Sequence, residues 1–252
     1  MVINNPYIDK VKEHKNIINI YEDIYQYKGK WDKYFGNENE LILEVGTGLG
    51  NFFSKEVQKN PNQNFLGMEI KYKRLYIGAE KSLGNLNNYA NNGVRIRNIE
   101  EKIAKHLEEK TLSIESFSPL QEKKQKVNFV LLKDFGENID QIFKENEISK
   151  SYIFFPDPWA KKKRWLKNRL LQTEFLNNLY KITKIGGKSI IKTDHFGYYE
   201  FILEELKKTP WSIVKVSTDF ENEPEFKNEE TTEFQQLFRG QDIKINYIEL
   251  QK

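Results

Sequence analysis

Short apolar runs alternate along the chain with longer segments in which apolar residues recur every three or four positions. The short runs have the length and composition of β-strands, and the longer spacing places apolar side chains on one face of a helix. Strands are predicted at residues 40–45, 64–68, 127–132, 151–155, 188–193, 211–218 and 243–250. Helices are predicted at residues 50–59, 72–83, 139–145, 173–183 and 196–207. This alternation is typical of βαβ units, so we predict an α/β fold built on a mainly parallel sheet.

The predicted elements indicate one main domain with two additions. Residues 1–38 precede the first strand as a Tyr-rich arm that we expect to be partly helical, and residues 39–252 have the length of a single domain. Residues 84–126 interrupt the pattern with an Asn-rich stretch and a charged stretch, which we interpret as an insertion. The pair Gly186 and Gly187 is expected to end the helix predicted at residues 173–183.

The composition limits the kinds of functional site that this protein can contain. The chain has 40 Lys and Arg against 37 Asp and Glu, a net charge of +3, so a nucleic-acid site must come from local clustering of basic residues. It has no cysteine and three scattered histidines, His14, His106 and His195, so we expect no metal site. No apolar run is long enough to cross a membrane and the N-terminus lacks an apolar signal segment, which predicts a cytoplasmic protein.

A glycine-rich turn follows the first predicted strand, within residues 41–50. Gly46, Gly48 and Gly50 suit a turn that needs positive φ and a close approach of the backbone to a ligand. Asn51 stands where a dinucleotide site would have the last glycine of G-x-G-x-x-G, which favours a different nucleoside cofactor. Taken alone, the turn fits a ligand site and a plain reversal of the chain equally well.

Two carboxylates accompany this turn. Glu69 ends the second predicted strand about 20 residues after the glycines, where a carboxylate can accept both hydroxyls of a ribose. The order and spacing of the two motifs favour this function over a solvated acid at a strand end. Glu44 lies on an otherwise apolar strand, and because an unpaired buried carboxylate is costly, we expect it to have a polar or cationic partner.

The segment of residues 153–169 combines a constrained acid with a basic run. Asp157 lies between Pro156 and Pro158, and each proline restricts its own backbone and that of the residue before it. Six basic residues follow without an acid among them: Lys161, Lys162, Lys163, Arg164, Lys167 and Arg169. The arrangement suits a polyanion whose reactive base meets the acid, with phosphates bound by the basic run. The alternatives are a turn-forming Asp157 and an ordinary solvated loop.

Two tryptophans flank the basic residues. Trp165 lies among the charges and is the better candidate for stacking on an exposed base. Trp159 is expected to pack in the core or at a hinge.

Together with Thr193, Asp194 and the segment 232–235, these motifs resemble those of the tRNA (guanine-N7)-methyltransferase family. The resemblance covers most of the chain from about residue 40 onward, apart from the insertion. It implies a Rossmann-like methyltransferase fold, with helices on both faces of a mainly parallel, seven-stranded sheet whose last strand is antiparallel. It also implies an enzyme that uses S-adenosylmethionine to methylate N7 of a guanine in the variable loop of tRNA.

By this resemblance, three carboxylates and the glycine turn bind the cofactor. Glu44 is expected to contact its methionine part, Glu69 its ribose, and Asp134, after the third predicted strand, the region of its adenine. The expected cofactor-binding residues are Glu44, Gly46, Gly48, Gly50, Glu69 and Asp134.

The resemblance assigns the remaining motifs to the substrate. Asp157 is expected at the catalytic centre, with Lys161 and Asp194 contacting tRNA. The segment 232–235 corresponds to a substrate-binding pattern, T-x-[F/Y]-E, in which Gln235 replaces the final glutamate and removes a charge. The expected substrate-binding residues are Lys161, Asp194, Thr232, Glu233, Phe234 and Gln235.

The implied reaction suits a chain that has no cysteine. N7 of guanine already has an in-plane lone pair, so its attack on a sulfonium methyl group needs positioning and electrostatics rather than a general base. Asp157 would hold the base and stabilise the positive charge that methylation creates, with Asp194 assisting. A structural alternative is that Asp194 caps the helix beginning near residue 196.

Two other functions fit the sequence. A methyltransferase for a different substrate would keep the glycine turn and Glu69 without needing the basic run. A non-catalytic tRNA-binding module would keep the basic run without needing the cofactor motifs. The expected partners are tRNA and the cofactor, with neither a membrane nor a metal, and the protein is expected to be a monomer or a homodimer.

Overall fold

The computed structural model describes residues 5–86, 127–224 and 243–252, together with Thr232, Phe234, Gln235, Phe238 and Gln241. With the exception of Val127, all of these residues belong to one compact unit. The expected insertion, from residue 87 onward, and the expected substrate residue Glu233 lie outside the described residues.

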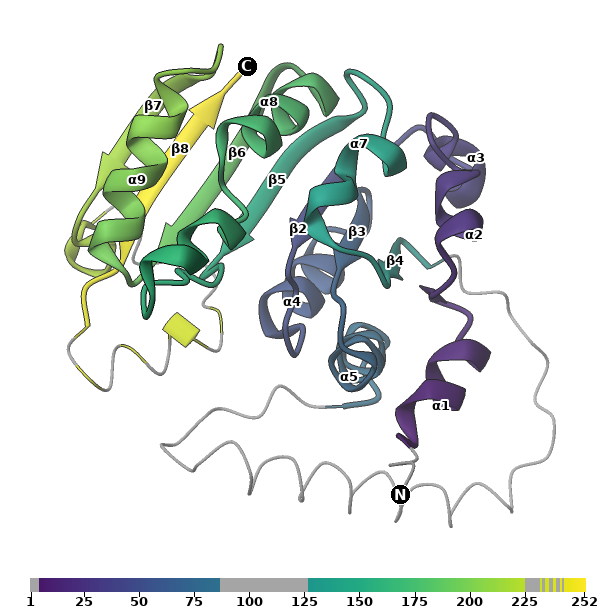
Figure 1. Cartoon of the computed structure of the whole chain (residues 1–252). Coiled ribbons are helices and arrows are strands. Elements are labelled where there is room, and N and C mark those ends of the chain that lie inside the picture. The colour runs from purple at the N-terminus through teal and green to yellow at the C-terminus, as the bar shows by residue number, and fades with distance from the viewer. Residues whose placement is uncertain are drawn as a thin grey trace, which may run out of the picture. The chain divides into compact units, whose positions relative to one another are not determined.

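A mainly parallel sheet organises the described residues (Figure 1). Its strands are β1 (Ile17–Ile18), β2 (Leu41–Val45), β3 (Asn64–Met68), β4 (Phe129–Leu132), β5 (Ile148–Phe154), β6 (Thr183–Thr193), β7 (Ser212–Ser217) and β8 (Asn246–Gln251). They are ordered β1-β4-β3-β2-β5-β6-β8-β7. Strand β8 runs antiparallel to both β6 and β7, and the other pairs are parallel. The predicted fold class and the antiparallel last strand are confirmed.

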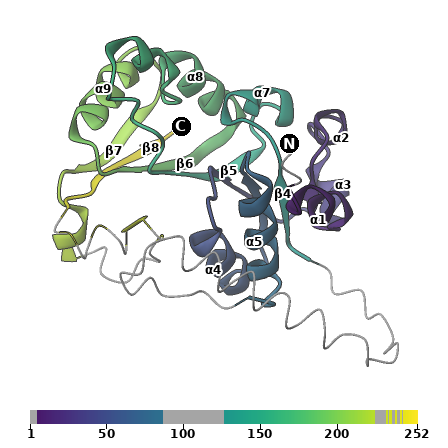
Figure 2. The ribbon, with the colours of Figure 1, turned by 60° about the horizontal axis from the view of Figure 1, so that its bottom comes forward.

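Helices cover both faces of this sheet. Figure 2 shows α7 (Ile139–Ile142), α8 (Thr173–Ile182) and α9 (Phe196–Leu206) on one face, and α4 (Asn51–Lys59) and α5 (Tyr72–Ser82) on the other. Three short 3-10 helices, η2 (Gly136–Asn138), η3 (Lys163–Asn168) and η4 (Phe220–Asn222), lie in the connections. Strands covered on both sides are apolar throughout, which is why they stand out in the sequence as short continuous runs. The central residues Leu43, Leu66, Val130, Ile153 and Ile191 are fully buried.

The described part of the N-terminal arm is helical, as predicted, and it also adds a strand. Its helices are α1 (Tyr7–Glu13), α2 (Tyr21–Tyr25) and α3 (Trp31–Phe35). Between α1 and α2, Ile17 and Ile18 pair with the edge of β4, where Lys133 N donates to Ile18 O at 2.9 Å. The described residues therefore form an eight-stranded sheet rather than the expected seven-stranded one. A two-residue run is too short to produce a periodic signal, so the sequence pattern could not predict it.

The glycine pair in β6 does not end helix α8, contrary to the prediction. The helix ends at Ile182, and Thr183 continues in extended conformation while its Oγ1 donates to Leu179 O at 2.7 Å. Gly186 and Gly187 lie inside β6. A Cβ on Gly187 would come within 2.8 Å of Lys184 O and Thr183 Cγ2 in β6 itself and within 2.9 Å of Ser149 O in β5, so crowding from both strands explains this glycine.

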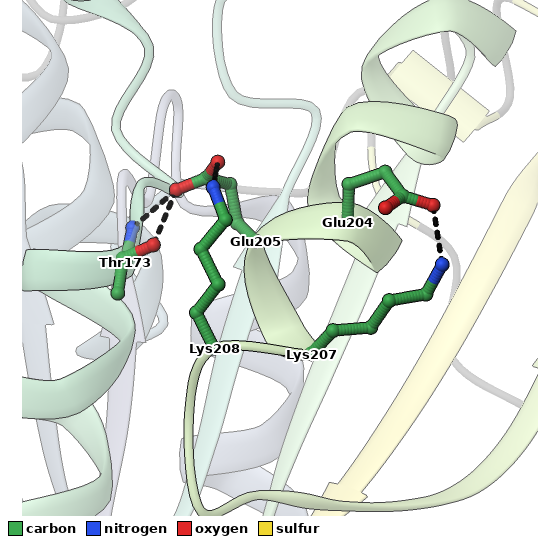
Figure 3. Close-up of polar contacts among 5 residues, drawn as sticks. All are labelled: Thr173, Glu204, Glu205, Lys207 and Lys208. Atoms are coloured by element: carbon green, nitrogen blue, oxygen red, sulfur yellow. Dashed lines mark hydrogen bonds and ion pairs between the residues drawn. The ribbon is translucent and has the colours of Figure 1, made fainter.

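A carboxylate of α9 caps the N-terminus of α8 (Figure 3). Glu205 Oε2 accepts hydrogen bonds from Thr173 N, at 2.9 Å, and from Thr173 Oγ1, and Lys208 binds the other carboxylate oxygen. Burial alone would raise the pKa of Glu205, but the bonds from Lys208 and Thr173 outweigh it and lower that pKa. The Glu205 carboxylate therefore stabilises the folded protein at pH values above its ordinary pKa. This stabilisation is lost as pH falls through the lowered pKa.

We expect Glu205→Ala to lower the free energy of unfolding by about 1–2 kcal/mol at neutral pH, because it removes a helix cap. The difference from the parent protein should shrink in acid, where Glu205 is protonated. Glu204→Ala is the matched control, since the pair of Glu204 and Lys207 in Figure 3 is exposed and exposed ion pairs contribute little. Urea unfolding of the three proteins at two pH values measures both effects, and equal losses at positions 204 and 205 would contradict the assignment.

Candidate functional site

A cleft of about 390 Å³ lies at the carboxyl ends of the central strands. Its walls include Gly46 and Gly48 after β2, Glu69 after β3, Asp134 after β4 and Asp157 after β5. The strand order reverses between β3-β2 and β5-β6, which is where open α/β sheets bind their ligands. The fold therefore brings together motifs that are far apart in the sequence, in a cavity of the size that a small-molecule cofactor occupies.

The glycine turn has the left-handed backbone that its sequence predicted. The φ angles of Gly46, Gly48 and Gly50 are 84°, 55° and 72°. Gly46 N donates to Met68 O at 2.9 Å, which fastens the turn to the end of β3. Gly46 and Gly48 border the cleft. Gly50 instead faces Gly78 of α5, where a Cβ on Gly50 would lie 2.7 Å from the Gly78 Cα, so Gly50 permits the close packing of α4 on α5.

Glu69 is held by backbone donors on the wall of the cleft. Its Oε2 accepts from Gly48 N at 3.1 Å and lies 3.7 Å from Arg74 Nη1, and its Oε1 accepts from Lys71 N at 3.0 Å. The residue is only 6% exposed. Each carboxylate oxygen has two lone pairs, so acceptor capacity remains for two hydroxyl groups of a ribose.

A smaller cavity of about 30 Å³ continues the site beside Glu44. Glu44 is buried on β2, and Thr47, from within the glycine turn, lines the same space. Thr47 Oγ1 is buried and has no hydrogen-bond partner among the described residues, so a polar group bound here would satisfy it. Thr232 and Phe234 border this cavity too. The sequence singled out Glu44 and Thr232, but nothing in it distinguished Thr47 from any other turn residue.

Asp134 is fixed at the far side of the cleft and is 1% exposed. Its Oδ1 accepts from Phe135 N and from Asn138 Nδ2, both at 2.7 Å. Tyr25 of α2 lies against the same carboxylate: burial, followed by the charge of Asp134 and a hydrogen bond to it, raises the Tyr25 pKa to about 12. Tyr25 therefore stays protonated and can donate to Asp134. No sequence signal connected the N-terminal arm to this acid.

Asp157 lies on an exposed loop at the rim of the cleft. We call residues 155–159 the Asp157 loop. Phe155 and Trp159, at its two ends, have φ angles of 51° and 47°, a left-handed conformation that is strained for bulky side chains. Such strain costs about 1–3 kcal/mol per residue, persists where surrounding contacts impose it and is concentrated at functional sites. Phe155 N donates to Lys192 O of β6 at 2.8 Å, which holds the first end.

Trp159 borders the cleft and is 37% exposed, so of its two expected places, the core and a hinge, the core is wrong. Trp165 is half-buried against it, with the two ring centres 6.2 Å apart in an edge-to-face arrangement. Lys162 Nζ lies 5.0 Å from the centre of the Trp165 ring. Trp159 is consequently the tryptophan that presents aromatic surface at the cleft.

The basic run separates into two groups in the structure. The residues Lys161, Lys162, Lys163, Arg164 and Lys167 are exposed next to the Asp157 loop. Arg169 is buried. The exposed group, which includes the expected substrate residue Lys161, presents five positive charges beside Asp157.

The other expected substrate residues occupy different environments. Asp194 is half-buried after β6, and it is His195 that caps α9, its Nδ1 accepting from Tyr198 N at 3.1 Å. The structural alternative for Asp194, a helix cap, is therefore wrong. Phe234 borders the cleft and packs against Phe155, with ring centres 6.0 Å apart. Gln235 is fully buried, and its Nε2 donates to Glu221 Oε1.

No group of three or more His, Cys, Asp or Glu side chains in the described ranges is arranged to hold a metal ion. None of the helices within those ranges is long and apolar enough to span a bilayer.

Comparison with solved structures supports the fold. A structure titled as an antibiotic-related methyltransferase aligns with a TM-score of 0.53 at 14% identity, covering 89% of this chain and 92% of the other. The 16S rRNA methyltransferase KamB aligns with a TM-score of 0.52 at 14% identity, covering 88% of this chain and 91% of the other. At this level of identity, the likeness shows the methyltransferase fold.

Sequence comparison is more specific. A family model described as "Putative methyltransferase" matches residues 38–247. A bifunctional glycosyltransferase/methyltransferase of Fusobacterium nucleatum is 33% identical over 98% of this chain, which spans 33% of that relative. A tRNA (guanine-N(7)-)-methyltransferase of Clostridioides difficile is 30% identical over 92% of this chain and 89% of its own length, and one of Bdellovibrio bacteriovorus is 28% identical over 89% and 90%. The chain therefore belongs to the tRNA (guanine-N7)-methyltransferase family.

Proposed function

We propose that this protein transfers a methyl group from S-adenosylmethionine to N7 of a guanine in the variable loop of tRNA. The observation that carries the proposal is the position of Asp157 at the rim of a cleft that is also lined by Glu69 and by Gly46 and Gly48 of the glycine turn. Exposed basic residues beside Asp157 supply the charge that an RNA backbone requires. The names of the relatives support the choice of substrate.

The residues of the cleft fit S-adenosylmethionine. Glu69 offers two fixed carboxylate oxygens for the ribose hydroxyls. The small cavity beside Glu44, with the unsatisfied Thr47 hydroxyl, suits the charged end of the methionine part. Asp134, supported by Asn138 and Tyr25, suits the amino group of adenine. When bound, the cofactor supplies an electrophilic methyl group on a sulfonium centre.

The protein's own contribution to the reaction is positioning and charge stabilisation. Because N7 has a free lone pair and no proton to lose, none of the side chains needs to act as a general base. Asp157 accepts from guanine N1–H and N2–H, which orients the base, and its negative charge stabilises the cationic imidazole ring of the product. Asp194 assists from the end of the neighbouring strand β6.

The exposed basic residues bind the RNA backbone, and Trp159 offers a surface on which a base can stack. From the C-terminal part of the chain, Phe234 borders the cleft and Thr232 borders the smaller cavity beside Glu44.

Incubation of the purified protein with unmodified bulk tRNA and tritium-labelled S-adenosylmethionine, at low salt, tests the function. We expect label in the RNA, recovered after digestion as 7-methylguanosine. Calorimetry with the cofactor alone separates the two alternatives. Cofactor binding without transfer to tRNA would indicate a methyltransferase for another substrate, and tRNA binding without cofactor binding would indicate a non-catalytic module. Either result would contradict the proposal.

Charge reversal of the basic run should weaken tRNA binding and its dependence on salt. For a variant with Lys161→Glu, Lys162→Glu and Lys163→Glu, we expect the slope of log affinity against log salt to fall by about 0.7 for each phosphate that the variant no longer neutralises. Filter binding at several salt concentrations measures the slope. Lys161→Glu alone, compared with Lys33→Glu at an exposed lysine of α3, matches the change in net charge, and Lys33→Glu should have the smaller effect. An unchanged slope in the triple variant would exclude phosphate binding by these lysines.

A further inference from the structure

Arg169 differs from the rest of the basic run because it is only 7% exposed. A buried charge needs compensating contacts. Within the described residues these are a backbone carbonyl and two aromatic rings: Nε donates to Pro158 O at 2.9 Å, and the guanidinium carbon lies 4.7 Å and 4.6 Å from the ring centres of Tyr198 and Phe201. A residue engaged in this way is poorly placed to bind a phosphate of the RNA.

The two rings give Arg169 a rigid support. Tyr198 and Phe201 belong to α9, and Tyr198 is fully buried. The Tyr198 hydroxyl accepts from Leu171 N at 3.1 Å, and Gln172 Nε2 donates to Arg169 O at 2.9 Å. The guanidinium therefore lies against two rings of α9, and the backbone of its own segment is tied to the same helix through Leu171 and Tyr198.

The hydrogen bond from Arg169 reaches the Asp157 loop at the end where Trp159 lies, which is one of its two strained ends. Pro158 O belongs to the peptide group that joins Pro158 to Trp159, and Trp159 has the left-handed φ of 47°. A donor that fixes the plane of this peptide favours the strained conformation over relaxed ones. At the other end, Phe155 is held by the carbonyl of Lys192. The loop that presents Asp157 is thus fastened to β6 at one end and, through Arg169, to α9 at the other.

We propose that Arg169 is a positioning residue that holds the Asp157 loop in its productive conformation, rather than a contact to tRNA. The inference rests on the proposed function. Arginine is suited to this role because its planar guanidinium can donate in its plane while its faces stack on aromatic rings. A lysine keeps the charge but lacks this geometry.

Arg169→Lys should therefore lower kcat about tenfold to a hundredfold, the loss typical of a reacting group displaced by about 1 Å. The KM for the cofactor and the salt dependence of tRNA binding should stay the same, because Arg169 contacts neither ligand. The same substitution at the exposed Arg164 should have a smaller effect on kcat. In an Asp157→Asn background, Arg169→Lys should cause little further loss, since the group that it positions is already removed.

Two results would overturn the inference. One is an equal loss of rate from Arg169→Lys with and without the Asp157 carboxylate, which would indicate a general structural effect. The other is a weaker salt dependence of tRNA binding in Arg169→Lys, which would indicate a phosphate contact. If Arg169→Lys does not fold, Phe201→Leu replaces it in the same comparison with and without Asp157→Asn. Phe201→Leu removes one supporting ring and keeps the bond to Pro158. A parent protein that transfers no methyl group to tRNA would refute the proposed function, whereas an active parent with a fully active Arg169→Lys variant would refute only the role of Arg169.

Discussion

Asp157→Asn should lower kcat for methyl transfer about 100-fold to 1000-fold, the loss typical of removing one preorganised group that stabilises charge in the transition state. The substitution keeps the size of the side chain and removes the negative charge that we propose stabilises the developing imidazolium. Cofactor affinity should be unchanged, because the proposed cofactor contacts are made by Glu69 and the glycine turn rather than by Asp157. Single-turnover rates with saturating tRNA, combined with calorimetry for the cofactor, separate the two quantities.

Asp194→Asn is the matched control for this prediction. It makes the same chemical change at a half-buried acid after β6. Because we propose that Asp194 only assists Asp157, its loss of rate should be smaller. An Asp157→Asn variant that turns over like the parent would show that the electrostatic role is wrong. A variant that loses cofactor binding instead would place Asp157 in the cofactor site.

Glu69→Ala should weaken binding of S-adenosylmethionine by about 1.5–3 kcal/mol, which is roughly a tenfold to hundredfold rise in Kd. The substitution removes the proposed carboxylate acceptors for the ribose and also leaves Gly48 N and Lys71 N without their present acceptor. One of the hydrogen bonds that fix the glycine turn is then absent. Calorimetric titration with the cofactor, or with its demethylated product, measures the effect directly.

The cleft offers a matched control for Glu69. Glu137 also borders it but is exposed, so Glu137→Ala should weaken cofactor binding much less. Equal effects at the two positions would mean that negative charge in the cleft matters and that the fixed geometry of Glu69 does not.

The strands of the sheet and the order of its motifs could be predicted because they depend on local sequence. A strand that is covered on both faces appears in the sequence as an apolar run. The residues that follow such a strand lie at the carboxyl edge of a parallel sheet, independently of the sequence elsewhere in the chain. Glu69 and Asp157 are such residues, and both line the cleft. The positive φ angles of Gly46 and Gly48 follow from the same local requirement for a tight turn.

What could not be predicted depends on contacts between distant segments. Tyr25 reaches Asp134 because the two-residue strand β1 places the arm beside β4, and neither feature has a periodic signal. Arg169 reads as one more charge in a basic run, and only its distances to Pro158 and α9 distinguish it. Trp159 was expected in the core or at a hinge because large aromatic side chains usually pack there, whereas the strained backbone of its loop presents it at the cleft.

Gln235 illustrates how a departure from the family pattern can be accommodated. In this chain its side-chain amide donates to the carboxylate of Glu221, a bond that a glutamate at position 235 could not donate when ionised. Two adjacent carboxylates would instead repel each other.

The central claim is that N7 of a variable-loop guanine accepts the methyl group. Its most direct test compares two tRNAs that differ only at that guanine: one unmodified, and one in which 7-deazaguanine replaces it, so that a carbon stands in place of N7. With labelled S-adenosylmethionine, we predict stoichiometric transfer to the first tRNA and none to the second. Equal labelling of both tRNAs would contradict the proposed site of methylation.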